Sequence, residues 1–565
     1  MPAEPETRRG WRRTWLVVVR HARRFWYRLS VGGCLGALLF FAASMTPSLL
    51  PRAWPLQGVA SGLSVGIGYG IGTFAGWLLV KMGFKPLAGR RLRVVRGVLI
   101  GLGIVIVPLF GVLGSRWQRE VRELVQMPTS DTHYYALVLV IAFLLARFLV
   151  GAARVLRTLV RRLTGFGSRF ISPAFARVLA VVLVGTVLVT LLNDTLGPVL
   201  LSLANHGFSI SDTGTAAGAT RPQDPERSGS PESLTGWDQL GMEGRGFVAF
   251  GPTAEQIAAF TGTASMTPIR AYAGLDSVAG EGEQGLQEEA DLVVRELVRT
   301  RAFDRKVLAV ATTTGRGWVN QATAAALEYM YGGDTAIAAM QYSFLPSPVA
   351  FVADQATPPL AGKILFQTVR AYWLGLPAAR RPKLVVMGES LGSYGSQGAF
   401  DGTHGVLDEV DAAVWTGTPN FTDLWSRVTG NRKPGSWQQV PDYDGCTRVC
   451  FAGRAADIPA GAHPTVLYLQ HPTDPVVWWS PDLILKRPDW LAQGAPPGRR
   501  PGMVWVPVVT FWQITMDMVF SSSMPDGYGH HYGADFANAW AAVLPPPGWT
   551  DSDTQRLRVL LGDGE

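Results

Sequence analysis

Five long apolar runs in the first part of the chain constrain its fold more than any other feature. They cover residues 32–50, 58–80, 97–114, 134–152 and 178–201. Each approaches the ~20 residues that a helix needs to cross a hydrocarbon core about 30 Å thick. The first run has no small-residue cleavage site and more runs follow it, which excludes a signal peptide. Residues 31–204 are therefore predicted to form an all-α transmembrane bundle of about five helices.

Glycines recur at four-residue intervals inside the second apolar run. Gly62, Gly66 and Gly70 form one series, and Gly68, Gly72 and Gly76 form another. Nucleotide binding by a glycine-rich loop is excluded inside a membrane span. Small residues at this spacing allow two helices to approach closely. The run is therefore predicted to pack tightly against its neighbours.

Charge divides the chain at the end of the apolar region. Residues 1–204 carry 25 Lys and Arg against 6 Asp and Glu, a net charge of +19. The whole chain has a net charge of +8, which leaves −11 for the remainder. Basic segments that flank membrane spans, followed by an acidic domain, do not describe a nucleic-acid-binding protein. The partners expected from this pattern are the lipid bilayer and a lipid or ester substrate, and the oligomeric state stays open.

The positions of the basic residues predict the orientation in the membrane. They gather in residues 1–30, between the second and third runs, and between the fourth and fifth. By the positive-inside rule these segments are cytoplasmic, and residues 1–30 form a basic tail or interfacial helix. An odd number of spans then places everything after residue 204 on the outer face of the plasma (inner) membrane. Residues 205–235 are rich in Ser, Thr, Gly and Pro and are predicted to be a flexible linker.

From residue 236 to 565 the sequence alternates between short apolar runs and amphipathic helices. Strands are expected at 244–250, 268–275, 306–312, 335–342, 384–387, 411–415, 466–470 and 503–510. Repeated β-α-β units predict a mostly parallel, doubly wound sheet, with ligands at the carboxyl ends of its strands. The long irregular segment 417–465 is a candidate cap over that edge.

A G-x-S-x-G sequence, Gly388-Glu389-Ser390-Leu391-Gly392, follows the predicted strand 384–387. In a nucleophile elbow the serine occupies a strained turn between strand and helix, and small neighbours let the backbone pass closely. The following helix presents its N-terminal N–H groups to a developing oxyanion. The motif alone is weak, and its value depends on an acid and a histidine that follow in that order.

Both partners occur in the expected order. Asp474 lies just beyond the predicted strand 466–470, and neither rival acid, Asp457 or Asp482, follows a predicted strand so closely. Asp474-Pro475 also suits a plain turn. His530 and His531 lie in a glycine-rich loop between the last predicted strand and a C-terminal helix. Serine, acid and histidine in this order are typical of an α/β-hydrolase.

The remaining candidate site residues lie in loops near these positions. The backbone N–H groups of Leu391 and of Thr313 or Thr314 are the predicted oxyanion hole. Candidate substrate contacts are the side chains of Arg316, Trp318, Glu389, Trp478 and Trp479. Arg316 is equally plausible as a solvated loop residue. Trp478 and Trp479 are equally plausible as ordinary core residues.

Two of the three cysteines, Cys446 and Cys450, are close enough in sequence for a short-loop disulfide. Two free thiols are the alternative. Three intervening residues are too few for a zinc site without further ligands nearby, and neither a metal nor another cofactor is expected. A disulfide would agree with an oxidising compartment outside the cytoplasm.

Several motifs together resemble the bacterial membrane-anchored α/β-hydrolase family, in which a multi-span N-terminal region precedes a hydrolase domain of its own type. They are "SLLPR", "TTTGRGWVN", "GGDTAIAAMQYS", "GESLGSYGS", "LYLQHPTDPVVWW", "RPDWL" and "GYGHHYG", and they extend from about residue 30 to 543. The resemblance implies Ser390, Asp474 and a histidine as catalytic triad. The family's last motif, G-H-G-H-x-Y, assigns the histidine to His530. Its first histidine is Tyr528 here, and His531 stays the alternative base.

These features predict a membrane-anchored serine hydrolase, of esterase or lipase type, that acts on a lipid or cell-envelope ester. An acyltransferase using the same triad is one alternative. Another is a membrane transporter or sensor whose outer domain only has the hydrolase fold, and a peptidase would use the same residues.

Overall fold

The computed structural model describes residues 29–128, 135–196, 199, 212–493 and 503–562. Most of the predicted basic tail therefore lies outside the described residues. The chain divides into two compact units. The helical unit contains Met1–Arg122, Pro128–Val184 and Met503–Met516, and the sheet unit contains Glu123–Met127, Gly185–Gly502 and Asp517–Glu565.

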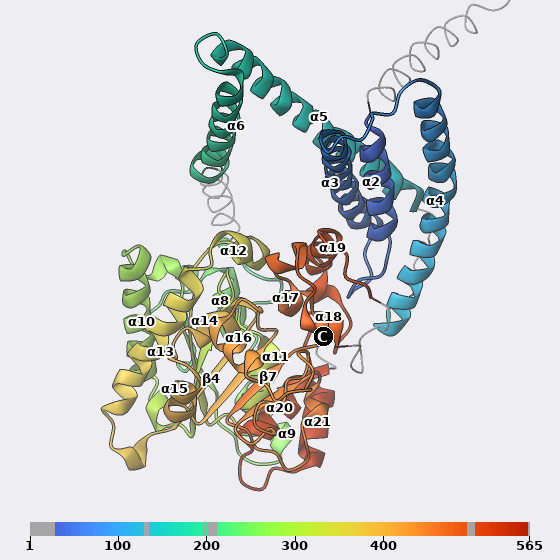
Figure 1. Ribbon diagram of the computed structural model, residues 1–565. Helices are drawn as coiled ribbons and strands as arrows, with labels where there is room; N and C mark the ends of the chain where they lie inside the picture. Colours follow the sequence, from blue (N-terminus) through green and yellow to red (C-terminus); the bar gives the residue numbers. More distant parts are fainter. Residues whose placement is uncertain (1–28, 129–134, 197–198, 200–211, 494–502, 563–565) are drawn as a thin grey trace, which may run out of the picture. The chain divides into compact units, whose positions relative to one another are not determined.

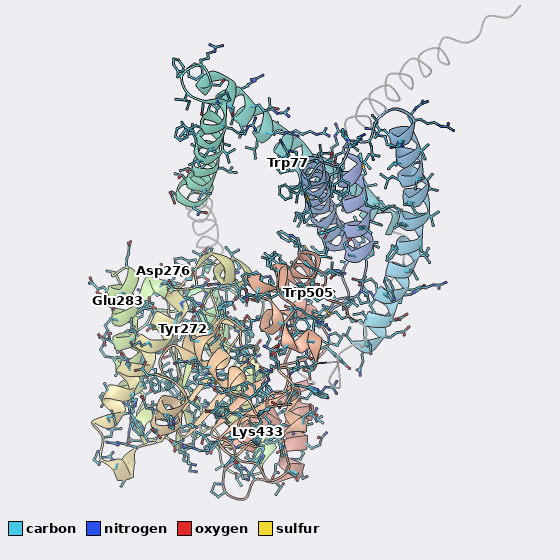
Figure 2. The ribbon with its side chains drawn as sticks, viewed as in Figure 1. Trp77, Tyr272, Asp276, Glu283, Lys433 and Trp505 are labelled. Atoms are coloured by element: carbon cyan, nitrogen blue, oxygen red, sulfur yellow. A yellow bond between two sulfur atoms is a disulfide. The ribbon has the colours of Figure 1, made fainter. Side chains whose placement is uncertain are left out.

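The helical unit is built from long apolar helices (Figure 1). They are α2 (Val31–Ser44), α3 (Trp54–Lys81), α4 (Gly89–Leu124), α5 (Tyr135–Gly167) and α6 (Pro173–Thr190). Within the described residues four helices, 54–81, 89–124, 136–167 and 173–190, are long and apolar enough to cross a membrane. Apolar side chains cover their outer surfaces, and Trp77 on α3 is 52% exposed (Figure 2). Such exposure suits a lipid environment.

The first predicted span differs from the structure in length. Helix α2 has 14 residues, or about 21 Å at 1.5 Å per residue, less than a bilayer core of about 30 Å. The side chain of Ser30 caps its first turn by accepting from the N–H of Gly33. The sequence continues into Pro47 and Pro51, which cannot donate the hydrogen bonds of a continuing helix. The expected number of spans therefore falls from five to four among the described helices.

The glycines of α3 pack against two different helices. A Cβ atom at Gly72 would overlap the carbonyl of Gly32 on α2, and one at Gly68 would lie 2.5 Å from Phe40 of α2. A Cβ at Gly62 or Gly66 would lie 2.9 or 2.7 Å from Leu145 or Leu149 of α5. The predicted close packing is confirmed at these four positions. A Cβ at Gly70 or Gly76 would meet nothing within 4 Å.

A buried polar cluster closes the helical unit at the end of α2. The backbone N–H of Arg52 donates to Oε1 of Gln118 at 2.7 Å, and its Nε donates to Oε1 of Gln57 at 2.9 Å. Nε2 of Gln513, on α19 (Val509–Met518), donates to the carbonyl of Thr46 at 2.9 Å. The segment Met503–Met516 is thus hydrogen-bonded into the helical unit, although most of the sheet unit precedes it in the sequence.

The sheet unit contains seven parallel strands in the order β1-β3-β2-β4-β5-β7-β6. They are β1 (Ile269–Ala273), β2 (Val307–Thr312), β3 (Thr335–Met340), β4 (Lys383–Glu389), β5 (Ala412–Thr416), β6 (Val449–Ala452) and β7 (Val466–Leu469). All residues of six strands are buried. Burial on both faces is what a parallel sheet between two helical layers requires.

Two groups of helices flank the sheet (Figure 1). One group contains α10 (Gly282–Arg299), α13 (Thr357–Leu374) and α14 (Leu391–Gln397), and the other contains α11 (Gln321–Met330), α20 (Asp535–Val543) and α21 (Asp551–Gly562). Leu327 of α11, Val385 of β4 and Trp540 of α20 are fully buried in one core cluster. The sheet predicted from the sequence is confirmed, and all of its strands are parallel.

Two local predictions differ from the structure, and the candidate cap stays a prediction. The expected strand 244–250 is mostly helix α8 (Gly241–Ala249), because a short apolar run does not distinguish a buried strand from a buried helix. The expected strand 503–510 pairs with no strand of the described sheet, where Pro507 lacks an N–H and Val508 has a φ of 68°. The candidate cap 417–465 contains α16 (Asp423–Gly430) and the edge strand β6.

The described part of the predicted linker, residues 212–235, packs onto the sheet unit. Arg227 is 3% exposed and donates to the carbonyls of Val248 and Pro252 at 3.0 and 2.7 Å. Ser228 donates its backbone N–H to Arg270 of β1 at 3.0 Å. Composition alone suggested a tether, but these backbone and guanidinium hydrogen bonds fix the segment. The domain therefore begins before residue 236.

Candidate active site

Ser390 lies at the turn between β4 and α14, at the carboxyl edge of the sheet. Its φ and ψ are 57° and −123°, a conformation that non-glycine residues rarely adopt. Its N–H donates to the carbonyl of Thr416 at 2.9 Å, which fixes the turn to the end of β5. Strained backbone of this kind is held in place only by well-packed surroundings.

The two glycines around Ser390 are required by close contacts. A Cβ atom at Gly388 would overlap the carbonyl of Gly392, and one at Gly392 would overlap the carbonyl of Thr312. The elbow therefore presses against the end of β2. This geometry explains why the weak sequence pattern has glycine at both positions.

Asp474 and His530 form a buried hydrogen-bonded pair. Nδ1 of His530 lies 2.7 Å from Oδ2 of Asp474, and the two side chains are 8% and 0% exposed. A carboxylate only accepts, so Nδ1 carries the proton and Nε2 is left as the basic nitrogen. The N–H of Val476 donates to Oδ1 of Asp474 at 2.9 Å and holds the carboxylate at the start of α17 (Pro475–Trp478).

Gly417 connects the His530 ring with the elbow. It follows Thr416, the residue that accepts from the N–H of Ser390. A Cβ at Gly417 would overlap Cε1 of His530 and lie 3.2 Å from Oδ2 of Asp474. Ser390, Asp474 and His530 are thus gathered around the carboxyl end of β5.

Burial and charge act in opposite directions on the pKa of His530. Burial alone disfavours the imidazolium, but the negative charge of Asp474, its hydrogen bond and the negative charge of Glu389 together outweigh burial. The pKa of His530 is therefore raised above its ordinary value. A raised pKa is the property expected of a histidine that accepts a proton during a reaction.

Tyr532 and His471 support this pair, and neither was predicted from the sequence. The hydroxyl of Tyr532 donates to Oδ2 of Asp474 at 2.7 Å, the same oxygen that His530 uses. His471 stacks on the Tyr532 ring at a centroid distance of 4.1 Å, and its Nδ1 lies 2.9 Å from the carbonyl of Gly529. Burial lowers the pKa of His471 to about 4, so its ring stays neutral. In the sequence, the one indication that Tyr532 supports the pair was its position two residues after His530.

His531 occupies a different environment from His530. Its Nδ1 lies 2.7 Å from the carbonyl of Met524. Of the two adjacent histidines, His530 is the one that is hydrogen-bonded to Oδ2 of Asp474.

The loop after β2 contains the other candidate oxyanion donors. The N–H of Thr314 donates to the carbonyl of Trp318 at 3.0 Å, so it is already engaged within the loop. Thr313 directly follows the point where β2 contacts Gly392, and its hydroxyl donates to the carbonyl of Met340 at 2.8 Å. Of the two predicted donors in this loop, the backbone of Thr313 is the better placed.

Glu389 and Arg316 make defined contacts. Oε2 of Glu389 accepts from Nδ2 of Asn320 at 2.7 Å, and burial raises the pKa of this carboxyl. Glu389 and Trp318 border the same small hollow at the end of β4. Arg316 turns toward Asp212, with Nη2 4.0 Å from Oδ1, and its side chain is 19% exposed. This ion pair joins Arg316 to another residue of the sheet unit.

Trp478 and Trp479 have different surroundings. Trp478 is fully buried, and its indole donates to the carbonyl of His471 at 3.1 Å. The Trp479 ring packs edge-on against Phe351 at 5.4 Å, and Phe351 and Tyr394 both pack against Phe421 at 5.0 and 5.1 Å. Tyr394 lies on α14, four residues after Ser390. We call Phe351, Tyr394, Phe421 and Trp479 the aromatic cluster.

Cys446 and Cys450 form a disulfide, with Cα atoms 4.2 Å apart. It joins the end of an irregular loop to β6, whose first residue is Val449. The disulfide therefore links the edge strand β6 covalently to the loop that precedes it.

A parallel sheet with a serine elbow at the end of its fourth strand, followed by a buried Asp–His pair, defines an α/β-hydrolase fold. Residues 269–557 match the alpha/beta-hydrolase family, and residues 45–252 match the alpha/beta-hydrolase family N-terminus. The chain belongs to this alpha/beta-hydrolase family, and the resemblance seen in its motifs is confirmed. No curated protein and no solved structure matches the chain.

Proposed function

We propose that the protein is a membrane-anchored serine hydrolase that cleaves carboxylic esters through an acyl-enzyme. In this proposal Ser390 is the nucleophile, His530 the general base and Asp474 the group that orients it. The observation that carries the proposal is the strained elbow at Ser390 beside the Asp474–His530 hydrogen bond of 2.7 Å. Family membership supports hydrolase chemistry in general.

The proposed reaction follows from the protonation states of these residues. Nε2 of His530 removes the proton from Ser390 Oγ as the oxygen attacks the ester carbonyl. The N–H groups of Leu391 and Thr313 meet the oxyanion, and loss of one such donor costs about 3 kcal/mol in the barrier. His530 then returns the proton to the departing alkoxide. Water, activated by the same histidine, releases the acid and restores Ser390.

A lipid or cell-envelope ester is the substrate class that this setting favours. Four helices are long and apolar enough to cross a membrane, and the aromatic cluster gives an acyl chain an apolar surface close to α14. The outer face of the membrane is proposed from the basic segments that join α3 to α4 and α5 to α6, because cytoplasmic positions for these two segments put the end of α6 outside. With four spans in place of five, the chain before α3 would then lie outside as well, so the cytoplasmic basic tail expected from an odd number of spans no longer follows. The Cys446–Cys450 disulfide supports the outer location of the sheet unit. An acyltransferase would differ only in replacing water by another hydroxyl.

Labelling with a membrane-impermeant fluorophosphonate tests the nucleophile and the location together. We expect label on the wild type and on Ser393→Ala, a control in the same helix, and none on Ser390→Ala. Label on Ser390→Ala would refute the nucleophile. Label that appears only after cell lysis would place the site on the cytoplasmic side and refute the proposed location.

A further inference from the structure

A second cavity of the sheet unit, of about 400 Å³, lies between α16, the loop that follows it and α18 (Asp489–Ala492). Its walls include Asn420, Thr429, Gln438, Trp478, Asp482 and Asp489. The volume falls within the range of about 300–1,000 Å³ typical of small-molecule sites. We call this space the polar cavity.

The polar cavity and the aromatic cluster are adjacent at two points of the chain. Asn420 borders the cavity and the next residue, Phe421, belongs to the cluster. Likewise Trp478 borders the cavity and Trp479 belongs to the cluster. Asn420 lies three residues after Gly417, which touches His530, and Trp478 lies four residues after Asp474. The loop that carries Asp474 and the loop whose Gly417 contacts His530 therefore both continue into a polar space and into an apolar cluster. This division suits a ligand with a polar head and an apolar tail.

Two of the three basic side chains at the polar cavity pair with its two carboxylates, and the third, Arg487, donates to the carbonyl of Leu491 at 3.1 Å. Nη2 of Arg432 lies 2.9 Å from Oδ2 of Asp489, and Nζ of Lys486 lies 3.1 Å from Oδ2 of Asp482. A phosphate accepts hydrogen bonds only, and the two carboxylates would repel it. A hydroxyl both donates and accepts, so it can bond to the carboxylates and to the amides of Asn420 and Gln438 alike.

Buried groups at the cavity agree with a hydroxylated ligand. Thr429 is 2% exposed, and its hydroxyl has no hydrogen-bond partner among the described residues. A buried hydroxyl without a partner is costly, and a ligand hydroxyl would satisfy it. Trp425, Trp478 and Trp490 border the same space and give it an amphipathic floor.

We propose that the polar cavity binds the sugar head of a glycosyl ester while the acyl chain lies on the aromatic cluster. The inference rests on the proposed function because it names the alcohol part of the substrate of that same site. It makes the protein selective for esters of polyhydroxylated alcohols over esters of simple or phosphorylated ones.

Three esters that share an octanoyl chain test this selectivity with the full-length protein in nanodiscs. They are octanoyl glucose, octanoyl glycerol phosphate and ethyl octanoate. We expect the highest kcat/KM for octanoyl glucose. The double variant Asn420→Ala, Asp482→Asn should lower it about tenfold, the effect of losing hydrogen bonds to a neutral ligand, and leave ethyl octanoate unchanged. The control Asp408→Asn, at an exposed residue outside the cavity, should change neither.

The outcomes separate the inference from the proposed function. Hydrolysis of ethyl octanoate without preference for the glucose ester, or a preference for the phosphate ester, overturns the sugar site and leaves the hydrolase intact. Titration of the protein with octyl glucoside, followed by tryptophan fluorescence, measures binding in the cavity without catalysis. A saturable change that the double variant loses supports the site even if no ester is cleaved, and an identical response of both proteins overturns it.

Discussion

At the scale of single residues, the site depends on how Asp474 is held. Its Oδ2 accepts from both His530 and Tyr532, and its Oδ1 accepts from the N–H of Val476. The carboxylate therefore has little freedom to rotate. The orientation of the His530 ring, and so the position of its basic nitrogen, follows from these three hydrogen bonds.

Tyr532→Phe should lower kcat about tenfold or more while the protein stays folded. The change removes one hydrogen bond to a charged group, an interaction worth about 1.5–3 kcal/mol. It should also displace the acid limb of the pH–rate profile to higher pH, because the Asp474 carboxylate, once it loses this hydrogen bond, stabilises the His530 imidazolium more strongly. Tyr528→Phe, in the same loop, is the control. Equal kinetics for both variants would contradict a role for the Tyr532 hydroxyl.

Activity should rise with pH through the pKa of His530, because in the proposed reaction only the neutral ring accepts the serine proton. That pKa is raised by Asp474, so the midpoint should lie above the ordinary histidine value of about 6.5. Asp474→Asn should lower kcat by about 10⁴ and displace the midpoint to lower pH. A pH–rate profile of this variant checks the sign, with Asp457→Asn as a control. An unchanged midpoint would argue against the Asp474–His530 coupling.

At the scale of secondary-structure elements, α3 is the helix on which the helical unit is assembled. Its glycines contact α2 on one side and α5 on the other. Apolar side chains alone do not drive helices together inside a bilayer, so such close backbone approach supplies much of the association. The spacing of the glycines indicated the packing but could not indicate the partners.

Gly72→Leu should therefore destabilise the helical unit, whereas Gly70→Leu should be tolerated. A side chain at Gly72 would overlap the carbonyl of Gly32, and one at Gly70 meets nothing within 4 Å. Thermal unfolding of both variants in the same detergent measures the difference. Equal loss of stability in the two variants would contradict the packing of α2 on α3.

The strands inside the sheet were predictable because they are continuous apolar runs between helices. β4 and β7 are examples, and the positions of Ser390 and Asp474 followed from them. Residues 212–235 were not predictable, because the hydrogen bonds of Arg227 are invisible in a sequence rich in Ser and Gly. Tyr532 was missed for a similar reason, since its hydroxyl meets Asp474 only in the folded chain.

At the scale of the whole molecule, the two units are not successive segments of the chain. Met503–Met516 belongs to the helical unit, although the segments before and after it belong to the sheet unit. The chain thus passes between the units more than once. His530 lies just after the last of these passages.

A protease site inserted between residues 205 and 211 should therefore fail to release the sheet unit from membranes. The C-terminal fragment keeps Met503–Met516, which is hydrogen-bonded to the end of α2 through Gln513. Fractionation of cut membranes, followed by a denaturing gel, measures the result. Recovery of the C-terminal fragment in the soluble fraction would contradict the assignment of this segment.

The late position of Met503–Met516 also has a consequence for biosynthesis. The ribosome makes the long apolar helices first and every strand of the sheet, from β1 to β7, before it reaches this segment. The helical unit therefore stays incomplete while the sheet is translated and begins to fold. His530 emerges only after α19 has been made, so the candidate active site is completed after this segment of the helical unit.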